Sequence, residues 1–393
     1  MRIIINGAGI AGTALAYWLG KLGHEVLLVE RAPRLRTGGF VVNLWGVGYD
    51  ALERMGLLQE LLERQHYSSE LRMVDSNGRT RGGYPSGVLL KLANGRMATL
   101  ARSDIAASIY AALGSSVETL FGESITTIDD DGTRVKVGFE HSPAREADLV
   151  IGADGLHSRV RQIVFGPDAK FEYPMGCHVA SFEVADYPHR NGDVYVAYTA
   201  PGRYVARFPM RDGRMLFFVL LRDEHLGGHV PADQVERKAA LVHALTDIGW
   251  ESDAILSALR HADDLYFDSI SQIRMDTWTN GRVALIGDAA ACPSLIAGEG
   301  AGFALAEAYV LAGELHRHGD IATAMAHYET RLKTVVARKQ KHAESLAASF
   351  VPRTEIGVRL RDYATLLMRL PVFPNLLMGR YFHDELVLPE YGI

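Results

Sequence analysis

The sequence predicts an α/β fold that combines a Rossmann-like parallel sheet, an antiparallel sheet and a set of C-terminal helices. Three observations support this prediction. A strand, a glycine-rich turn, a helix and a second strand follow one another over residues 2–30. Two later apolar strands run into turns that contain glycine and aspartate, at residues 147–155 and 282–288. Between them, four stretches of residues 176–222 alternate like antiparallel strands joined by short turns.

Length and composition are those of an ordinary globular protein. The chain has 393 residues, of which 48% are hydrophobic and 22% are charged, enough for two or three domains. The formal net charge of −6 argues against nucleic acid binding, which requires clustered Lys and Arg. No apolar run reaches membrane-spanning length and the chain begins directly with a strand, so we expect a cytoplasmic protein without a signal peptide.

The two cysteines, Cys177 and Cys292, provide neither a disulfide framework nor a metal-ligand spacing. We interpret both as small buried hydrophobic residues. No metal site is expected.

The N-terminal unit contains the motif Gly7-Ala-Gly9-Ile-Ala-Gly12 between its first strand and its helix. Gly7 permits the tight turn, Gly9 lets a pyrophosphate approach the backbone, and Gly12 lets the helix pack on the strand. Glu30 ends the second strand, where a carboxylate accepts the ribose hydroxyls of adenosine and repels a 2′-phosphate. The unit therefore predicts a site for FAD or NAD rather than NADP.

Two later stretches repeat the form of an apolar strand followed by glycine and aspartate. They read ADLVIGADGLHSRVR at residues 147–161 and RVALIGDAAACPSLIAGEGAG at residues 282–302. The second ends in GEGAG, which opens an apolar helix. A helix N-terminus offers backbone amides and a positive dipole end, and small side chains let a flat ligand reach them.

Together the three motifs resemble those of the single-component flavin aromatic hydroxylases, the group A flavoprotein monooxygenases built like p-hydroxybenzoate hydroxylase. The resemblance covers residues 1 to about 320 and implies an FAD-binding domain of the glutathione-reductase type. It also implies that NADPH or NADH reduces the flavin and that O2, added at flavin C4a, oxygenates a small-molecule substrate. The group has no separate nicotinamide domain.

The resemblance assigns roles to positions of this chain. Arg102 would reach the ribityl-pyrophosphate side of FAD, and Asp288 would bind the ribityl or pyrophosphate region. Asp154 and Arg161 belong to the motif tied to both FAD and NAD(P)H, although pairing of Arg161 with a carboxylate is an open structural alternative. No residue is assigned as acid or base. The predicted FAD contacts are Gly7, Gly9, Ile10, Ala11, Gly12, Glu30, Arg31, Arg102, Asp154, Asp288, Gly298, Gly300 and Ala301.

The third motif departs from the usual form of this group, GDAAH followed by GQGxN. Ala291 replaces the histidine, Glu299 replaces the glutamine, and Ala301-Gly302 stand in the asparagine region. A carboxylate near a reduced flavin disfavours the anion. Three outcomes are open for Glu299: it points away, it is protonated, or it tunes the potential.

The antiparallel strands and the loop of residues 37–46 are expected near the substrate. The candidate substrate residues are Asn43, Tyr198, Arg207 and Phe218, and the alternative for each is an ordinary half-buried strand side chain. Similarity beyond the motifs is to the tetracycline-inactivating and antibiotic-hydroxylase branch, mostly at scaffold positions. We expect a bulky phenolic or enolic, polyketide-like substrate, with a tetracycline as the sharper hypothesis.

The FAD-binding and substrate segments are predicted to alternate along a monomer or homodimer subunit. The FAD-binding parts are residues 1–71, 97–170 and 271–325, the substrate parts are residues 72–96 and 171–270, and C-terminal helices occupy residues 326–393. Within the last part, the basic run of residues 337–344 is interpreted as a solvated helix face, and a helix is expected to break at Pro371.

Other functions stay open. The altered GEGAG stretch is compatible with a flavin-binding sequestering or regulatory protein without turnover. A flavin halogenase shares the fold, but its usual WxWxIP stretch is absent, because the four tryptophans are isolated. An NAD-dependent dehydrogenase would not need the third motif.

Overall fold

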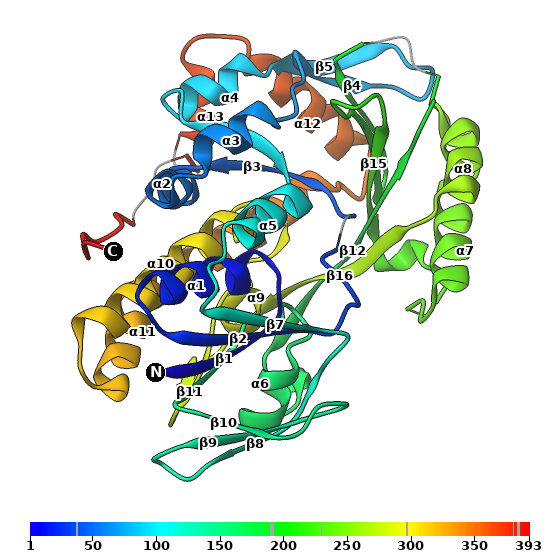
Figure 1. Cartoon of the computed structure of the whole chain (residues 1–393). Helices are drawn as coiled ribbons and strands as arrows, with labels where there is room; N and C mark the ends of the chain where they lie inside the picture. Colours follow the sequence, from blue (N-terminus) through cyan, green and yellow to red (C-terminus); the bar gives the residue numbers. More distant parts are fainter. Residues whose placement is uncertain (37, 189–191, 229, 296–297, 380, 383–385) are drawn as a thin grey trace.

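The computed structural model describes residues 1–36, 38–188, 192–228, 230–295, 298–379, 381–382 and 386–393. Two sheets dominate the structure, with helices between and around them (Figure 1). The α/β prediction, with a Rossmann-like parallel sheet, an antiparallel sheet and C-terminal helices, is confirmed.

A six-stranded sheet with the order β17-β18-β11-β1-β2-β7 forms the Rossmann-like part. All neighbouring strands pair in parallel except β17 and β18. The central strand β1 is buried over Ile3–Ile5, as a parallel strand covered on both faces requires. The strands are β1 (Arg2–Asn6), β2 (Glu25–Glu30), β7 (Val117–Phe121), β11 (Leu149–Gly152), β17 (Thr279–Asn280) and β18 (Val283–Leu285).

Helices α1 (Ile10–Lys21) and α10 (Gly300–Arg317) pack against each other beside this sheet. The rings of Trp18 and Tyr309 meet edge-to-face, with centroids 5.1 Å apart. Before the second motif, β8 (Ile125–Asp130) and β9 (Val135–Phe139) form a hairpin, which β10 (Arg145–Ala147) extends into a three-stranded sheet.

A seven-stranded sheet with the order β16-β12-β15-β14-β13-β4-β5 forms the second body. The four strands predicted within residues 176–222 are confirmed and pair antiparallel, with β13 beside β14, β14 beside β15, and β15 beside β12. Strands β4 and β5 extend the sheet, so the predicted boundary after residue 71 falls within β4. The strands are β4 (Glu70–Val74), β5 (Thr80–Pro85), β12 (Glu172–Val184), β13 (Tyr195–Ala200), β14 (Arg203–Pro209), β15 (Met215–Arg222) and β16 (Leu265–Ile273).

Helices cover both faces of this second sheet. On one face lie α7 (Gln234–Leu245) and α8 (Ser252–His261), whose apolar residues share a core with the sheet. On the other lies α12 (Glu355–Leu367), anchored where Arg361 donates to the hydroxyl of Thr199 at 2.7 Å. The helical chain breaks between α12 and α13 (Phe373–Met378), the region of Pro371 where a break was predicted.

The remaining elements lie around the two sheets. They are β3 (Val41–Trp45), α2 (Gly46–Met55), α3 (Leu58–Glu63), α4 (Gly87–Leu92), β6 (Met97–Ala101), α5 (Arg102–Ala111), α6 (Arg159–Val164), α9 (Asp288–Ala291) and the long α11 (Ile321–Phe350), with short 3-10 turns at Asp168–Lys170 and Asp223–His225.

Both cysteines are free and buried, as expected. Among the described helices, none is both long enough and apolar enough to cross a bilayer.

Candidate functional site

The turn between β1 and α1 has the geometry that the first motif predicts. Gly7 has φ +108, and a Cβ there would lie 2.5 Å from the carbonyl oxygen of Ala153. A Cβ on Gly12 would lie 1.8 Å from the carbonyl oxygen of Gly7. A Cβ on Gly9, in contrast, would meet nothing within 4 Å. The first and third glycines permit packing, whereas the second leaves bare backbone toward open space, which fits a pyrophosphate at the start of α1.

Glu30 lies beside this turn. Its two carboxylate oxygens accept from the amides of Ala8 and Ala32, both at 2.9 Å. Each oxygen has a second lone pair, so these two hydrogen bonds orient the carboxylate and still leave it able to accept hydrogen bonds from a ligand. The neighbouring Arg31 is exposed, and Ile10 and Ala11 form the buried first residues of α1.

The third motif meets this turn from the opposite side. Gly287 has φ +63, and a Cβ there would lie 3.0 Å from the Cβ of Ala11. Asp288 then opens α9, and one of its carboxylate oxygens lies 3.6 Å from where a Cβ on Gly300 would be. The structure thus gathers the starts of α1, α9 and α10, which are far apart in the sequence (Figure 1).

The small residues of GEGAG have two structural roles. A Cβ on Gly48 of α2 would lie 2.4 Å from the Cα of Gly302, so this glycine lets α2 approach α10 closely. Gly298 has φ +66, and its amide donates to the carbonyl of Leu295 at 2.9 Å. Gly300 and Ala301 follow as the first residues of α10, and it is their amides that open the helix.

Glu299 is paired with a lysine that the sequence interpretation placed in solvent. Its carboxylate accepts from Lys339 Nζ at 2.6 Å, and both side chains are 7% exposed. The prediction that residues 337–344 form a solvated face is therefore wrong at Lys339. It fails because a stretch of α11 runs past the start of α10, so one side of the basic run turns inward. The pair neutralises the carboxylate that appeared unfavourable beside a flavin.

Glu307 is a buried acid that the sequence interpretation missed. It lies two turns into α10 and accepts from the amide of Gly287, thereby tying α10 to the third motif. Burial raises its pKa to about 8, while the Gly287 hydrogen bond acts in the opposite direction. The available signal was a glutamate in the middle of the largely apolar GFALAEAYVLAGEL, flanked on both sides by apolar residues.

An aromatic cluster joins the two bodies. Phe40 lies 6.0 Å from Phe218 and 5.7 Å from Tyr266, measured between ring centroids. The guanidinium of Arg102 lies over the Phe40 ring at 4.9 Å, and Ser181 donates to the carbonyl of Gly39 at 2.9 Å. The glycine loop after β2 is thus held between α5 and the antiparallel sheet. Tyr266 and Phe40 were not among the predicted substrate residues.

The four predicted substrate residues fall into three places. Phe218 belongs to the cluster above, whereas Tyr198 and Arg207 point to the opposite face of the sheet. Tyr198 donates to the carbonyl of Ile248 at 2.6 Å, and Arg207 pairs with Glu251 at 3.0 Å and is 1% exposed. The alternation of strand side chains separates them from Phe218, so these three candidate substrate residues do not share one face of the sheet.

Asn43 lies near the start of α10. It accepts from the hydroxyl of Thr99 at 2.7 Å and lines a small surface hollow together with Glu299 and Gly302. Trp45, on the same strand, contacts two aromatic rings of the C-terminal segment, Tyr381 at 5.3 Å and Phe382 at 5.0 Å. The hydroxyl oxygen of Tyr381 also lies 2.9 Å from where a Cβ on Gly298 would be, so this ring covers the start of GEGAG as well.

The polar side chains of the second motif bond to neighbouring residues of the protein. Asp154 accepts from Asn6 at 2.7 Å, from Ser158 at 2.5 Å and from the amide of Arg159 at 2.7 Å. Burial raises the pKa of Asp154. Arg161 is 0% exposed and pairs with Asp168 at 2.6 Å, as its structural alternative expects.

Comparison with known proteins gives consistent matches. A family model described as an FAD binding domain matches residues 1–342. An uncharacterized protein of Mycobacterium tuberculosis is 40% identical over 86% of this chain and 91% of its own length. A flavin-dependent monooxygenase of an unknown prokaryotic organism is 30% identical over 89% of this chain and 90% of its own length. The crystal structure of tetracycline destructase Tet(51) is similar with a TM-score of 0.80 and 30% identity, over 93% of this chain and 95% of that chain.

Proposed function

We propose that this chain, which belongs to the FAD-binding domain family that includes flavin-dependent monooxygenases, uses NADPH or NADH and O2 to oxygenate a bulky phenolic or enolic, polyketide-like molecule. The observation that carries the substrate class is the aromatic cluster of Phe40, Phe218 and Tyr266. It lies between the Rossmann-like part and the antiparallel sheet, where a flat aromatic substrate would find apolar contacts.

Bound FAD would supply hydride acceptance and the activation of O2. Our proposal assigns the pyrophosphate to the backbone around Gly9 and the adenosine ribose to Glu30. It assigns the amides of Gly300 and Ala301 to the pyrimidine edge, where the helix N-terminus stabilises developing negative charge. Arg102 and Asp288 complete the set from the starts of α5 and α9.

Four predicted site residues receive structural roles in this proposal. Asp154 and Arg161 have their polar atoms engaged within the second motif, so we assign them to the fold rather than to FAD or NAD(P)H. Tyr198 and Arg207 lie beneath α7 and α8, and we assign them to sheet packing. The substrate contacts that we retain are Phe218 and Asn43, to which we add Phe40 and Tyr266.

A tetracycline belongs in the first panel of substrates, because one solved structure similar to this chain at 30% identity is named a tetracycline destructase. The shielding of the site also supports an oxygenase. Tyr381 and Phe382 pack on Trp45 at the start of α10, where exclusion of water would protect a reactive oxygen species from side reactions. We further propose that the protein is a monomer or homodimer in the cytoplasm, a reducing compartment that the scarcity of cysteines supports.

Oxygen-isotope labelling tests this function. The FAD-loaded enzyme is supplied with NADPH, ¹⁸O2 and a panel of phenolic polyketides that includes a tetracycline, and products are analysed by mass spectrometry. We expect one ¹⁸O atom in the product of at least one compound. Binding of compounds without any labelled product across the panel would instead support the sequestering protein.

A pair of variants connects that activity to the aromatic cluster. Phe218→Ala removes a ring from the cluster and should lower kcat/KM by about 10-fold or more, equivalent to about 1.4 kcal/mol of binding. Tyr198→Phe removes only a hydroxyl on the opposite face, and its kcat/KM should stay within about twofold of wild type. Equal effects of the two changes would contradict the assignment of faces.

A further inference from the structure

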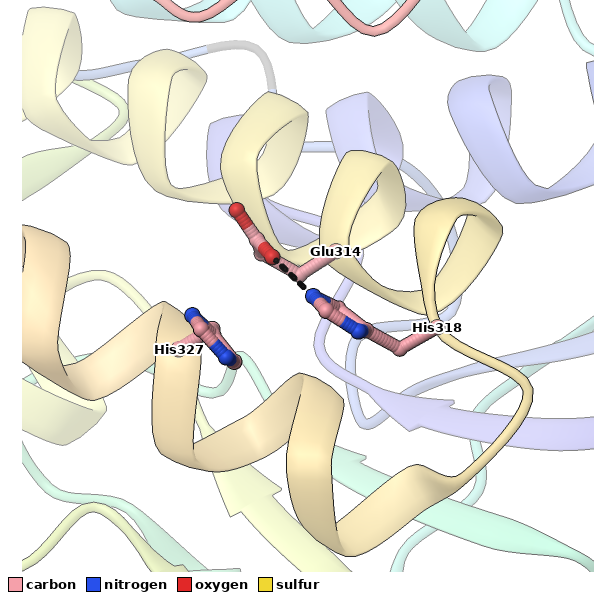
Figure 2. A group of neighbouring side chains, drawn as sticks. All are labelled: Glu314, His318 and His327. Carbon is pink, nitrogen blue, oxygen red and sulfur yellow. Dashed lines mark ion pairs between the residues drawn. The ribbon is translucent and has the colours of Figure 1, made fainter.

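Three potential metal ligands meet at the end of the αα-hairpin formed by α10 and α11. Glu314 lies in the last full turn of α10, His318 directly follows that helix, and His327 comes from the second turn of α11. Figure 2 shows the two imidazole rings stacked beside the carboxylate. The cluster lies at the opposite end of α10 from the proposed flavin site, roughly 20 Å along the helix.

One carboxylate oxygen of Glu314 is available to bind a metal, because the other oxygen accepts the hydrogen bonds that hold the side chain in place. Its Oε1 accepts from Arg331 at 2.5 Å and from the Tyr391 hydroxyl. Its Oε2 is buried and has no hydrogen-bond partner among the described residues, although it lies 3.1 Å from His318 Nε2. A buried oxygen without such a partner is unfavourable unless another group satisfies it. Arg331 and Tyr391 thus donate the kind of outer hydrogen bonds that commonly orient a metal-binding carboxylate.

The spacing of the ligand atoms suits a small cation. One atom from each of Glu314, His318 and His327 lies within 4.8 Å of the others. Two ligand atoms at about 2.1 Å from a tetrahedral metal are roughly 3.4 Å apart, close to the separation between Glu314 and His318. His327 is exposed, so rotation of its side chain can shorten the remaining distance. The imidazole planes are 15° apart with centroids at 4.5 Å, so the two rings lie face to face beside the carboxylate.

We propose that Glu314, His318 and His327 bind a divalent transition-metal ion of the zinc type. Two imidazoles and one carboxylate are ligands that such an ion accepts, and water from the exposed side of His327 would complete a tetrahedral shell. The bound ion would be structural. It joins the end of α10 to α11 and, through the hydrogen bond between Glu314 and Tyr391, to the C-terminal residues. The proposal is independent of the proposed oxygenase activity.

Calorimetric titration with ZnCl2 tests this site. The FAD-loaded protein, freed of metal by dialysis against a chelator, should bind one equivalent of Zn²⁺ and show a higher Tm with the metal. The double variant His318→Ala/His327→Ala should bind Zn²⁺ at least about 100-fold more weakly, since even the loss of an outer-shell partner costs about 10–100-fold. The matched control is His316→Ala, an exposed histidine in the last turn of α10, which should bind as wild type does.

Two results would overturn the proposal: no saturable binding of Zn²⁺ to the wild type, or unchanged binding in the double variant. Both histidines are at least partly exposed, so their removal should leave the flavin absorbance and circular dichroism unchanged. If the double variant does not fold, Glu314→Gln provides the second test, because it preserves the shape of the ligand and removes its charge. Wild-type affinity in that variant would equally exclude the site.

Discussion

At Gly9 the backbone borders open space, although the neighbouring glycines of the same turn are tightly packed. A Cβ on Gly12 would collide with the carbonyl of Gly7, whereas a Cβ on Gly9 would touch nothing. Gly9 also has φ −77, which any residue adopts. The fold itself therefore does not require glycine at this position. We propose that the requirement comes from the pyrophosphate of FAD, which would approach the backbone there.

This contrast predicts opposite effects for two similar substitutions. Gly9→Ala should change the stability of the FAD-free protein by no more than about 1 kcal/mol and weaken FAD binding by at least about 10-fold. Gly12→Ala should destabilise the FAD-free protein by about 3 kcal/mol or more, because the added methyl group overlaps backbone. Chemical denaturation and flavin fluorescence titration measure the two quantities. Undiminished FAD affinity of Gly9→Ala would place the pyrophosphate elsewhere.

Glu307 makes stability depend on pH. Its pKa is raised by burial from 4.5 to about 8. Between these values the unfolded chain has lost a proton that the folded chain keeps, so raising the pH favours unfolding. Below pH 4.5 both states are protonated, and above about 8 both are ionised, so the effect of this group is constant outside the window.

Glu307→Gln should remove this dependence. The free energy of unfolding of the variant relative to wild type should rise from pH 4.5 to about 8, by up to about 1.4 kcal/mol per pH unit, and then level off. Urea denaturation at a series of pH values measures the difference. A difference that does not vary across this window would show that Glu307 titrates normally.

At the scale of elements, the start of α10 depends on α11 through the pair of Glu299 and Lys339. Both side chains are almost fully buried, so each charge depends on the other. Removing one partner of a buried ion pair typically costs about 3–5 kcal/mol, whereas replacing both is often nearly neutral. The ion pair allows the third motif to contain Glu299 at the position where the resembling group A monooxygenases have glutamine.

A double-mutant cycle tests this dependence. Lys339→Met and Glu299→Gln should each destabilise the protein, Lys339→Met by about 3–5 kcal/mol, and the double variant should be more stable than Lys339→Met alone. Thermal or denaturant unfolding of the four proteins measures the coupling. Additive losses would mean that the two charges do not interact.

Most elements could be predicted because they have a clear local signal. The glycine turn, the DG hairpin of β8 and β9, and the strands β12 to β15 follow from periodicity and turn residues alone. The sequence could not predict which face of a strand packs against which helix or loop. Tyr198 and Phe218 both read as half-buried aromatic residues, and only the register and the position of α7 and α8 place them on opposite faces. Lys339 was missed for the same reason, since its burial depends on a helix distant in the sequence.

At the scale of the whole molecule, the chain crosses repeatedly between two bodies, and the site forms where the crossings meet. Residues 38–45 leave the parallel sheet, contact the antiparallel sheet through Phe40 and return toward α10 through β3. The C-terminal rings of Tyr381 and Phe382 then cover Trp45. In our proposal, a cofactor held by the first body would therefore lie next to a substrate held by the second. This arrangement is the physical basis of the proposed oxygenase.

The most direct test of that basis is anaerobic reduction of the FAD-loaded enzyme by NADPH in a stopped-flow instrument, with and without the polyketide panel. We predict that the flavin absorbance bleaches and that at least one compound accelerates bleaching by about 10-fold or more, because substrate and cofactor share the interface between the two bodies. Slow bleaching that no compound changes, in protein that retains FAD, would contradict the account and leave a flavin-binding protein without this reaction.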